Sequence, residues 1–286
     1  MRDAERETTM EHIETRFDGA VGIITINRRE RFNSLDVRTA RDLRRAGLQM
    51  ARNQAVRAIV LRGAGGVFCS GADLKYIAAG GDRADLAYLT PASRPAPAGP
   101  GAVFKQILEY LHSTISELRR APKPVVAAVD GMAAAGGMGL AMCCDLVVAS
   151  ERSTFEYAYF KTALTGAESS TFFLPRLVGL RRAMDLALLN PRLSAREAKE
   201  IGLVSLVVAD AAFEAEVIGL GRRLASGPTA SYAAAKQLMN ESAGVDRLDL
   251  HLDRELEALV RAADSADFAE GLDAFFARRP PVFSGT

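Results

Sequence analysis

The chain has 286 residues but no tryptophan, three histidines and three cysteines, and these scarcities exclude several kinds of protein. The cysteines are odd in number, and Cys143 and Cys144 are neighbours, so we do not expect a disulfide framework. We expect a reducing, cytoplasmic setting instead. His12, His112 and His251 lie far apart, and none is near a cysteine pair. We therefore expect no metal site, because the ligand spacing that such sites need is missing.

Net charge and long apolar runs are also lacking. Lys and Arg number 36 against 35 Asp and Glu, which gives a formal net charge of +1, and the basic residues are spread along the chain. This predicts no nucleic-acid surface. No apolar run reaches the roughly 20 residues of a membrane helix, and the charged N-terminal segment does not resemble a signal peptide. With 49% hydrophobic and 25% charged residues, the composition is typical of an ordinary globular protein.

The pattern of turns and apolar residues predicts a mixed α/β fold. Asp18-Gly19 separates two alternating segments and predicts a hairpin. Asp36 can cap a helix that runs to about residue 53. Short β-branched runs predict buried strands, and longer periodic stretches predict helices. The expected strands are 57–63, 124–131, 145–150 and 203–208, and the expected helices are 103–120, one near 136–143 and a long helical region over 228–276.

We expect two regions that no clear linker separates. Residues 1–210 would form a β/α core, and residues 211–286 would form a helical C-terminal region. Residues 1–10 are polar and are expected to be disordered. The Pro- and Gly-rich stretch 80–101 is expected to be a mobile loop, since its length suggests either function or disorder.

Two similar glycine-rich turns are the first candidate site. VFCSGADLK (67–75) and DGMAAAGGMGLAMCCD (130–145) each follow a buried strand and lead into a helix. The first N–H groups of a helix have no intrahelical partner. Two such starts could aim the N–H groups of Ala72 and Gly136 at one oxygen, and small residues would let the ligand approach the backbone. The alternative is that the glycines serve only tight turns and close packing.

Six segments in order along the chain resemble the enoyl-CoA hydratase/isomerase family, the crotonase superfamily. They are NRRERFNSLD (27–36), AIVLRGAGGVFCSGADLK (58–75), KPVVAAVDGMAAAGGMGLAMCCDLVVAS (123–150), FLPRLVG (173–179), LSAREAKEIGLVSLVV (193–208) and FAEGLDAFFARRPPVF (268–283). Each motif is modest alone, whereas six in the right order are specific.

The resemblance implies a crotonase-type spiral of repeated strand-strand-helix units with a helical C-terminal trimerisation region. It implies a homotrimer or a dimer of trimers, and an acyl-CoA substrate with no cofactor beyond the coenzyme A of that substrate. Matching the motifs places the two oxyanion-hole donors on Ala72 and Gly136. CoA contacts carried over in the same way fall on four basic residues, each of which could instead be a solvated surface charge: Arg29, Arg31, Lys75 and Arg278.

The two glutamates that hydratases of this family use are missing. Matching the motifs places Gly139 at the first position and Tyr159 at the second. Glycine cannot transfer a proton, and a tyrosine of ordinary pKa near 10 is a poor base at neutral pH. The sequence therefore argues against ordinary hydratase chemistry.

One nearby carboxylate is the candidate acid/base. TGAESSTFFLPRLVG (165–179) resembles the segment that carries the single catalytic glutamate of family isomerases. An ungapped match places that glutamate on Ala167, one residue before Glu168. A one-residue slip turns a helical side chain by about 100°, so Glu168 could face the acyl group only through a re-registered turn. Its alternative role is that of a glutamate in the first turn of a helix.

The leading interpretation is double-bond isomerisation of an enoyl-CoA, with Glu168 as the acid/base. Three alternatives stay open: hydration by a non-standard acid/base set such as Tyr159 or a bound water, thioester hydrolysis, and non-catalytic acyl-CoA binding.

Overall fold

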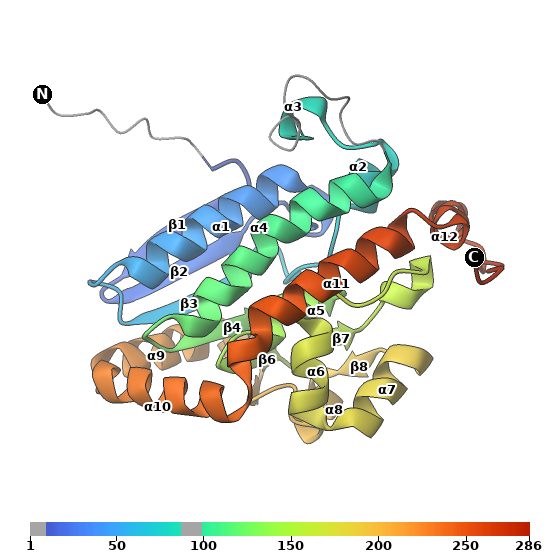
Figure 1. Cartoon of the computed structure of the whole chain (residues 1–286). Helices are drawn as coiled ribbons and strands as arrows, with labels where there is room; N and C mark the ends of the chain where they lie inside the picture. Colours follow the sequence, from blue (N-terminus) through green and yellow to red (C-terminus); the bar gives the residue numbers. More distant parts are fainter. Residues whose placement is uncertain (1–9, 87–98) are drawn as a thin grey trace, which may run out of the picture.

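The fold is seen in a computed structural model that describes residues 10–86 and 99–286 (Figure 1). The predictions for residues 1–10 and 80–101 fall largely outside these ranges. Of the second stretch, the described ends include a short helix, α3 (Arg83–Leu86), and the start of α4 (Pro100–Arg120). α4 thus begins three residues earlier than periodicity predicts, because Pro100 and Gly101 continue the helix at its N-terminus.

A six-stranded sheet forms the centre of the molecule, with strand order β1-β2-β3-β4-β6-β9. The first pair is antiparallel and the other pairs are parallel. The β1–β2 hairpin is confirmed: Asp18 pairs with Val21, and Gly19 has the positive φ of 59° that the tight turn requires. The strands are β1 (Ile13–Asp18), β2 (Val21–Ile26), β3 (Ala58–Gly63), β4 (Val125–Val129), β6 (Leu146–Ser150) and β9 (Leu206–Val208).

Both faces of the sheet are buried, which explains why its central strands are continuously apolar. On one face Ile24, Leu61 and Ala127 belong to the main core, under α1 (Val37–Arg52) and α4. On the other face Ile23 and Val60 pack against α9 (Phe213–Ser226). The predicted cap of α1 is confirmed, since the Asp36 carboxylate accepts a 2.8 Å hydrogen bond from the Thr39 N–H.

A second, three-stranded sheet supports the site. It has the order β5-β7-β8, with β5 (Met132–Ala134), β7 (Thr154–Glu156) and β8 (Leu193–Ser194). An isolated parallel bridge joins Cys69 to Ala133 and so ties the first glycine turn to the strand that enters the second. The helix after that strand, α5 (Gly136–Met142), agrees with the predicted one.

The C-terminal region is helical as expected, but the long helical stretch is divided. It comprises α10 (Thr229–Ser242), α11 (Leu248–Ala263) and α12 (Ala266–Ala277). α11 lies beside α4 along the length of the molecule (Figure 1). The boundary near residue 210 stays a prediction, and α9, just beyond it, directly covers one face of the sheet.

The remaining helices are short and surround the site or the sheet edge. They are α2 (Leu74–Ala78), α6 (Ser170–Val178), α7 (Leu180–Leu189) and α8 (Ala195–Glu200). Short 3₁₀ turns, η1 (Arg29–Arg31) and η3 (Tyr159–Thr162), also border the site. Within residues 10–86 and 99–286, no helix is long and apolar enough to cross a membrane.

Candidate functional site

A cavity of about 440 Å³ opens where the two glycine turns meet the C-terminal helices. Ala72, Gly136 and Glu168 all line it, and so do Arg31 and Lys75. Five of the residues expected in the site from the sequence are therefore brought together. Its apolar wall is formed by side chains from four helices and the loop after η3: Leu74, Phe104, Leu164, Leu259, Phe275 and Phe276.

The two glycine turns are in direct backbone contact. A Cβ added at Gly71 would lie 3.2 Å from the Gly136 nitrogen, and φ at Gly71 is 91°. A Cβ added at Gly137 would lie only 2.1 Å from the carbonyl oxygen of Cys69. Any larger residue would force the turns apart, so these glycines are needed for close approach.

The N–H of Ala72 is directed away from the neighbouring segment at Leu35. The parallel bridge to Leu35 uses the carbonyl of Gly71 at 2.8 Å and the N–H of Asp73 at 2.9 Å. The N–H of the residue between them therefore faces the opposite side. The helix after it begins at Leu74, because Asp73 is its N-cap.

Gly136 is the first residue of α5, so its N–H has no intrahelical acceptor. The residue before it, Ala135, has φ 46° and ψ −119°, a conformation that strains a residue with a Cβ. The N–H of Ala135 is held by the Glu156 carbonyl at 3.0 Å. Gly136, directly after this strained entry, lines the cavity.

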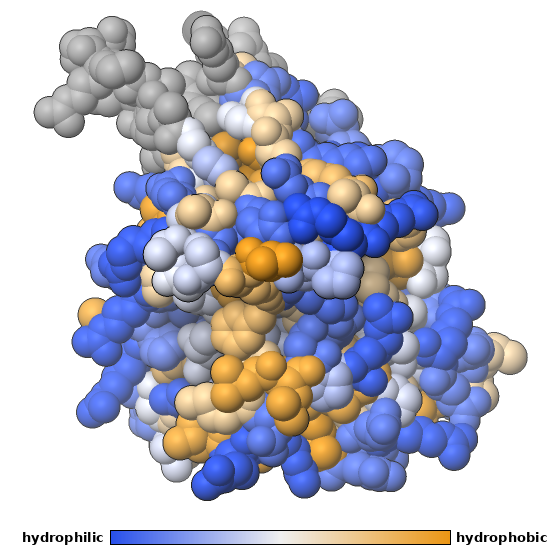
Figure 2. Space-filling model, turned by 90° about the vertical axis from the view of Figure 1, so that its right-hand side faces the viewer, coloured by the Kyte–Doolittle hydropathy of each residue, from blue (hydrophilic) through white to orange (hydrophobic). Residues whose placement is uncertain are grey.

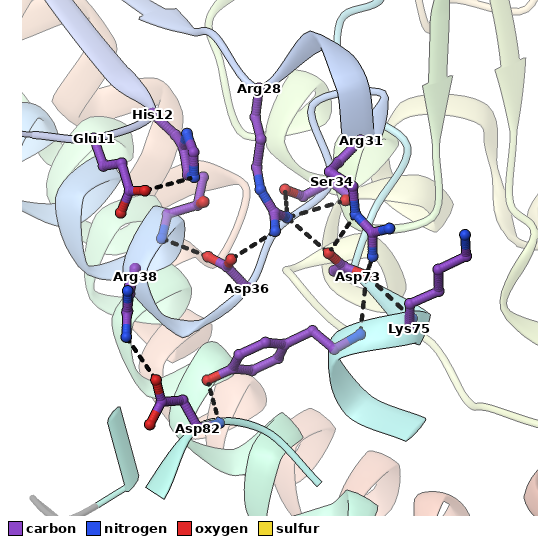
Figure 3. A network of polar contacts seen from close by, with 12 residues as sticks. Glu11, His12, Arg28, Arg31, Ser34, Asp36, Arg38, Asp73, Lys75 and Asp82 are labelled. Carbon is purple, nitrogen blue, oxygen red and sulfur yellow. Dashed lines mark hydrogen bonds and ion pairs between the residues drawn. The ribbon is translucent and has the colours of Figure 1, made fainter. Parts of the chain in front are cut away.

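Two arginines fix the turn at Ala72 through its neighbour Asp73 (Figure 3). Arg28 donates to Asp73 at 2.8 Å and also pairs with Asp36 at 2.8 Å. Arg31 donates to the same carboxylate through Nε at 3.1 Å. Burial alone would raise the pKa of Asp73, but these bonds and those from the start of α2 outweigh it and lower the pKa. Asp73 is thus an ionised structural cap.

The four basic residues expected to contact CoA divide into two groups. Arg31 and Lys75 line the cavity, and the Lys75 side chain extends away from the Asp73 network (Figure 3). In the described part of the chain, Arg29 and Arg278 are not among the lining residues. Arg29 is exposed and donates to Asn27 at 3.0 Å, while Arg278 is the exposed, left-handed C-cap of α12. The CoA contacts of all four stay predictions.

Glu168 reaches the cavity through an unusual turn before α6. Glu168 and Ser169 have φ values of 49° and 65°, and the helix begins only at Ser170. Glu168 is therefore not a first-turn helix residue. Its side chain lies against Gly136, because a Cβ added there would be 2.9 Å from both Cδ and Oε1 of Glu168. The carboxyl group and the N–H of Gly136 thus belong to one small region of the cavity.

The Glu168 side chain is 2% exposed, and its pKa is raised to about 7. Burial is the main cause, since desolvation disfavours the charged form. The nearby charge of Glu255 raises the pKa further, whereas a 2.6 Å hydrogen bond from the Tyr159 hydroxyl to Oε2 lowers it. A carboxyl group with a pKa near 7 can both accept and donate a proton at neutral pH.

The backbone of Glu168 occupies the space beside Gly139. A Cβ at Gly139 would lie 2.4 Å from the Glu168 carbonyl oxygen and 3.0 Å from its Cβ. A glutamate at position 139 could not be accommodated without moving this turn. Tyr159 is buried beside the same carboxyl group, and burial together with the Glu168 charge raises the pKa of Tyr159 well above its ordinary value.

The other buried acidic residues in the cavity wall are already paired with cations. Glu156 is buried and forms ion pairs with Lys161 and, at 3.3 Å, with Arg192. Asp73 is held by Arg28 and Arg31. Among the described residues that line the cavity, Glu168 is the buried carboxyl group that has no cationic partner.

Sequence reasoning missed Glu255. It lies on α11, is 4% exposed, and accepts hydrogen bonds from the N–H groups of Ser169 at 2.8 Å and Thr171 at 2.9 Å. The only sequence signal is an acidic residue on the apolar face of a helix. No spacing rule connects it to a turn 86 residues away.

Comparisons with known proteins agree with this architecture. The sequence pattern of the enoyl-CoA hydratase/isomerase family matches residues 16–93 and 102–286. The chain belongs to this family. A 1,2-epoxyphenylacetyl-CoA isomerase from Escherichia coli is 36% identical over 96% of this chain and 99% of that relative. A 4-chlorobenzoyl coenzyme A dehalogenase from Arthrobacter is 32% identical over 92% and 90%, respectively.

A solved enoyl-CoA hydratase from Mycobacterium avium subsp. paratuberculosis superimposes with a TM-score of 0.83. The two sequences are 32% identical, and the match covers 96% of this chain and 100% of that hydratase. The crotonase-type fold expected from the sequence is therefore confirmed. As a member of this family, the protein is an acyl-CoA enzyme, and the differing names of its relatives leave its individual reaction open.

Within the described residues no group of three potential metal ligands gathers at one point.

Proposed function

We propose that the protein moves the double bond of a 3-enoyl-CoA to the 2-position, with Glu168 as the single acid/base. The observation that carries this proposal is the position of Glu168. Its carboxyl group is buried, lacks a cationic partner among the residues that the structure describes, and lies against Gly136, the expected oxyanion donor. An isomerase of this kind needs one carboxyl group that carries a proton between two carbons, and its pKa of about 7 suits that task.

In the proposed reaction the thioester carbonyl oxygen accepts hydrogen bonds from the N–H groups of Ala72 and Gly136. The Glu168 carboxylate removes a proton from C2, and the electrons of that C–H bond form an enolate whose oxygen carries the negative charge. The electrons then return through C2 and C3 to C4, which takes the proton back from Glu168. The double bond now lies between C2 and C3. Each backbone donor would contribute a few kcal/mol to stabilising the enolate.

Hydration of a 2-enoyl-CoA is the second candidate, and it fits the site less well. It needs one group to deliver water to C3 and another to protonate C2. The Tyr159 hydroxyl donates a hydrogen bond to Glu168, and its raised pKa keeps it protonated at neutral pH, so it does not serve as a base. Two further alternatives are thioester hydrolysis, which needs the backbone donors and an activated water, and non-catalytic acyl-CoA binding, which needs only the cavity.

The test is the turnover of 3-enoyl-CoA thioesters by wild type and by Glu168→Gln. Gln keeps the shape of the side chain and can still accept the Tyr159 hydrogen bond, but it cannot carry a proton. We expect isomerisation to fall by at least about 1,000-fold. Glu200→Gln, an exposed substitution on α8, serves as the matched control and should leave turnover unchanged.

Unchanged turnover by Glu168→Gln would overturn the proposal. Conversion of 2-enoyl-CoA thioesters to 3-hydroxyacyl-CoA by wild type would instead identify a hydratase. Release of free thiol would identify a hydrolase, and tight CoA binding without turnover of any of these thioesters would indicate a binding protein.

A further inference from the structure

The Glu168 turn is held by two residues that come from different parts of the fold. Tyr159 lies on η3 and reaches the carboxyl group, while Glu255 lies on α11 and reaches the backbone just after it. We propose that both are positioning residues for Glu168. Tyr159 directs one carboxyl oxygen so that the other is presented to the substrate, and Glu255 holds the turn that brings the side chain into the cavity. This inference rests on the proposed function.

Tyr159 distinguishes the two oxygens of the Glu168 carboxyl group. Its hydroxyl is 2.6 Å from Oε2 and 2.9 Å from the Ala167 carbonyl oxygen. The phenol has one proton, and an ionised carboxylate is the stronger acceptor. Oε1 has no such partner and lies closer to Gly136, at 2.9 Å from a Cβ placed there against 3.3 Å for Oε2. Oε1 is therefore the oxygen that takes up the proton of the substrate.

The Ala167 carbonyl gives the tyrosine proton a second acceptor. When Glu168 becomes protonated, its attraction for the tyrosine hydroxyl weakens, and the hydroxyl can turn to the carbonyl without losing a hydrogen bond. Both protonation states of Glu168 are then satisfied inside a buried site. A carboxyl group that alternates between base and acid needs this property.

Glu255 stabilises the left-handed turn that Glu168 and Ser169 adopt. Such φ values are uncommon for residues other than glycine, so contacts elsewhere must hold them. Glu255 supplies them as a cap from another helix: it accepts the N–H groups of Ser169 and Thr171 and also the Thr171 hydroxyl. His251, one turn earlier on α11, contacts the same hydroxyl at 2.8 Å.

The groups that face Glu168 act in opposite directions on its proton affinity. The negative charge of Glu255 favours the protonated form, and the hydrogen bond from Tyr159 favours the ionised form. Tyr157, just after β7, and Cys69, in the first glycine turn, also face this carboxyl group, but burial raises the pKa of each to about 12, so both are neutral at ordinary pH. Tyr159 and Glu255 are thus the two side chains whose removal changes the balance.

The experiment compares Tyr159→Phe and Glu255→Gln with wild type. The first readout is kcat/KM for 3-enoyl-CoA isomerisation between about pH 5 and pH 9. The second is the pH at which Glu168 ionises, followed by the carboxyl infrared band that Glu168→Gln lacks. Tyr159→Phe should raise both midpoints, and Glu255→Gln should lower both, each by about one pH unit. Tyr159→Phe should also reduce kcat by about 10-fold, because Oε1 is no longer directed.

Two substitutions of the same kind are the controls. Tyr232→Phe on α10 and Glu257→Gln on the exposed side of α11 should move neither midpoint. Tyr159→Phe removes one oxygen atom and leaves the ring packed, so it tests the inference even if Glu255→Gln fails to fold.

The inference and the proposed function fail in different ways. If Glu168→Gln keeps full activity, the proposed function is wrong. If Glu168→Gln is inactive while Tyr159→Phe leaves both midpoints and kcat at the wild-type values, the inference is overturned. A shift of the pH midpoints of Tyr159→Phe and Glu255→Gln in the same direction would also overturn it. Such a shift would indicate a general disturbance of the site, whereas the two proposed roles predict opposite shifts.

Discussion

Glu168 shows how one residue can reach a cavity position that its place in the sequence does not predict. An alignment without gaps puts Ala167, not Glu168, at the glutamate position of family isomerases. Glu168 and Ser169 are both left-handed, and this turn of the chain brings the Glu168 side chain into the cavity. The sequence could supply the candidate, but the turn depends on Glu255, whose contact is long-range. Local patterns carry no information about such a contact.

Ionising Glu168 inside the protein should reduce stability, because its pKa is raised from the ordinary 4.5 to about 7. Between these values the folded state binds more protons than the unfolded state. The free energy of unfolding of wild type should therefore decrease as pH rises from about 4.5 to about 7. Gln at this position cannot ionise and avoids the cost.

We expect Glu168→Gln to be more stable than wild type at pH 8, by up to about 3 kcal/mol, and nearly equal to it at pH 4.5. Denaturant unfolding at both pH values measures this difference. Glu200→Gln should show no such pH dependence. A Glu168→Gln protein that is less stable than wild type at pH 8 would contradict the prediction.

At the level of secondary structure, α5 and the turn before α6 pack too closely for any side chain at Gly139. Gly139→Ala would place a Cβ 2.4 Å from the Glu168 carbonyl oxygen. We expect a loss of about 1–3 kcal/mol in stability and a larger fractional loss of isomerase activity, because the displaced group is the backbone that carries Glu168. Thermal unfolding and 3-enoyl-CoA turnover measure the two effects.

Gly219→Ala on α9 is the matched control. Nothing lies within 4 Å of a Cβ there, so the change should be neutral or slightly stabilising.

Gly139→Glu, which restores the residue type that hydratases carry, should not create hydratase activity. Efficient hydration of a 2-enoyl-CoA by Gly139→Glu would show that the turn can move to admit the side chain.

Most elements could be predicted from local pattern, and the errors have local causes. The hairpin at Asp18-Gly19, the cap at Asp36 and the buried strands follow from turn chemistry and from β-branched runs. α4 begins three residues earlier than periodicity predicts, because Pro100 and Gly101 continue the helix at its N-terminus. The helical pattern over 228–276 did not show its division into three helices. Gly244 and Ser265 mark the boundaries, but a single glycine or serine within a helical pattern is a weak signal for a helix end.

For the whole molecule, an exposed apolar surface on α7 bears on the oligomeric state. Leu180, Met184, Leu188 and Leu189 are between 52% and 77% exposed. Figure 2 shows apolar residues gathered in the lower part of the face that includes this helix. A surface of this kind is typical of an interface between subunits.

We expect a homotrimer or a dimer of trimers, with α7 buried between subunits. Light scattering after size-exclusion chromatography should give a mass of three or six chains. Leu188→Glu should reduce that mass, because it would place a charge in the interface. Arg223→Glu, an exposed change on α9 outside this apolar surface, also alters charge and is the control. A monomeric wild type would contradict the expectation.

The family could be recognised from six ordered motifs, and its fold followed, but the reaction could not. The backbone donors proposed at Ala72 and Gly136 would suit any thioester enolate, whatever reaction follows. The reaction depends on which carboxyl group reaches the cavity, and here that is decided by tertiary contacts to a single turn.

Arg31 belongs at once to the wall of the cavity and to the anchor of the Ala72 turn. An anionic part of a ligand that attracts Arg31 must compete with Asp73 for it. Such a contact would weaken an ion pair that helps to hold Asp73, the cap of α2, next to Ala72. If a ligand group bound at Ala72 depends on how Asp73 is held, thermodynamic reciprocity requires that each binding event change the affinity for the other by the same factor. One guanidinium group would then couple the two contacts of a single ligand.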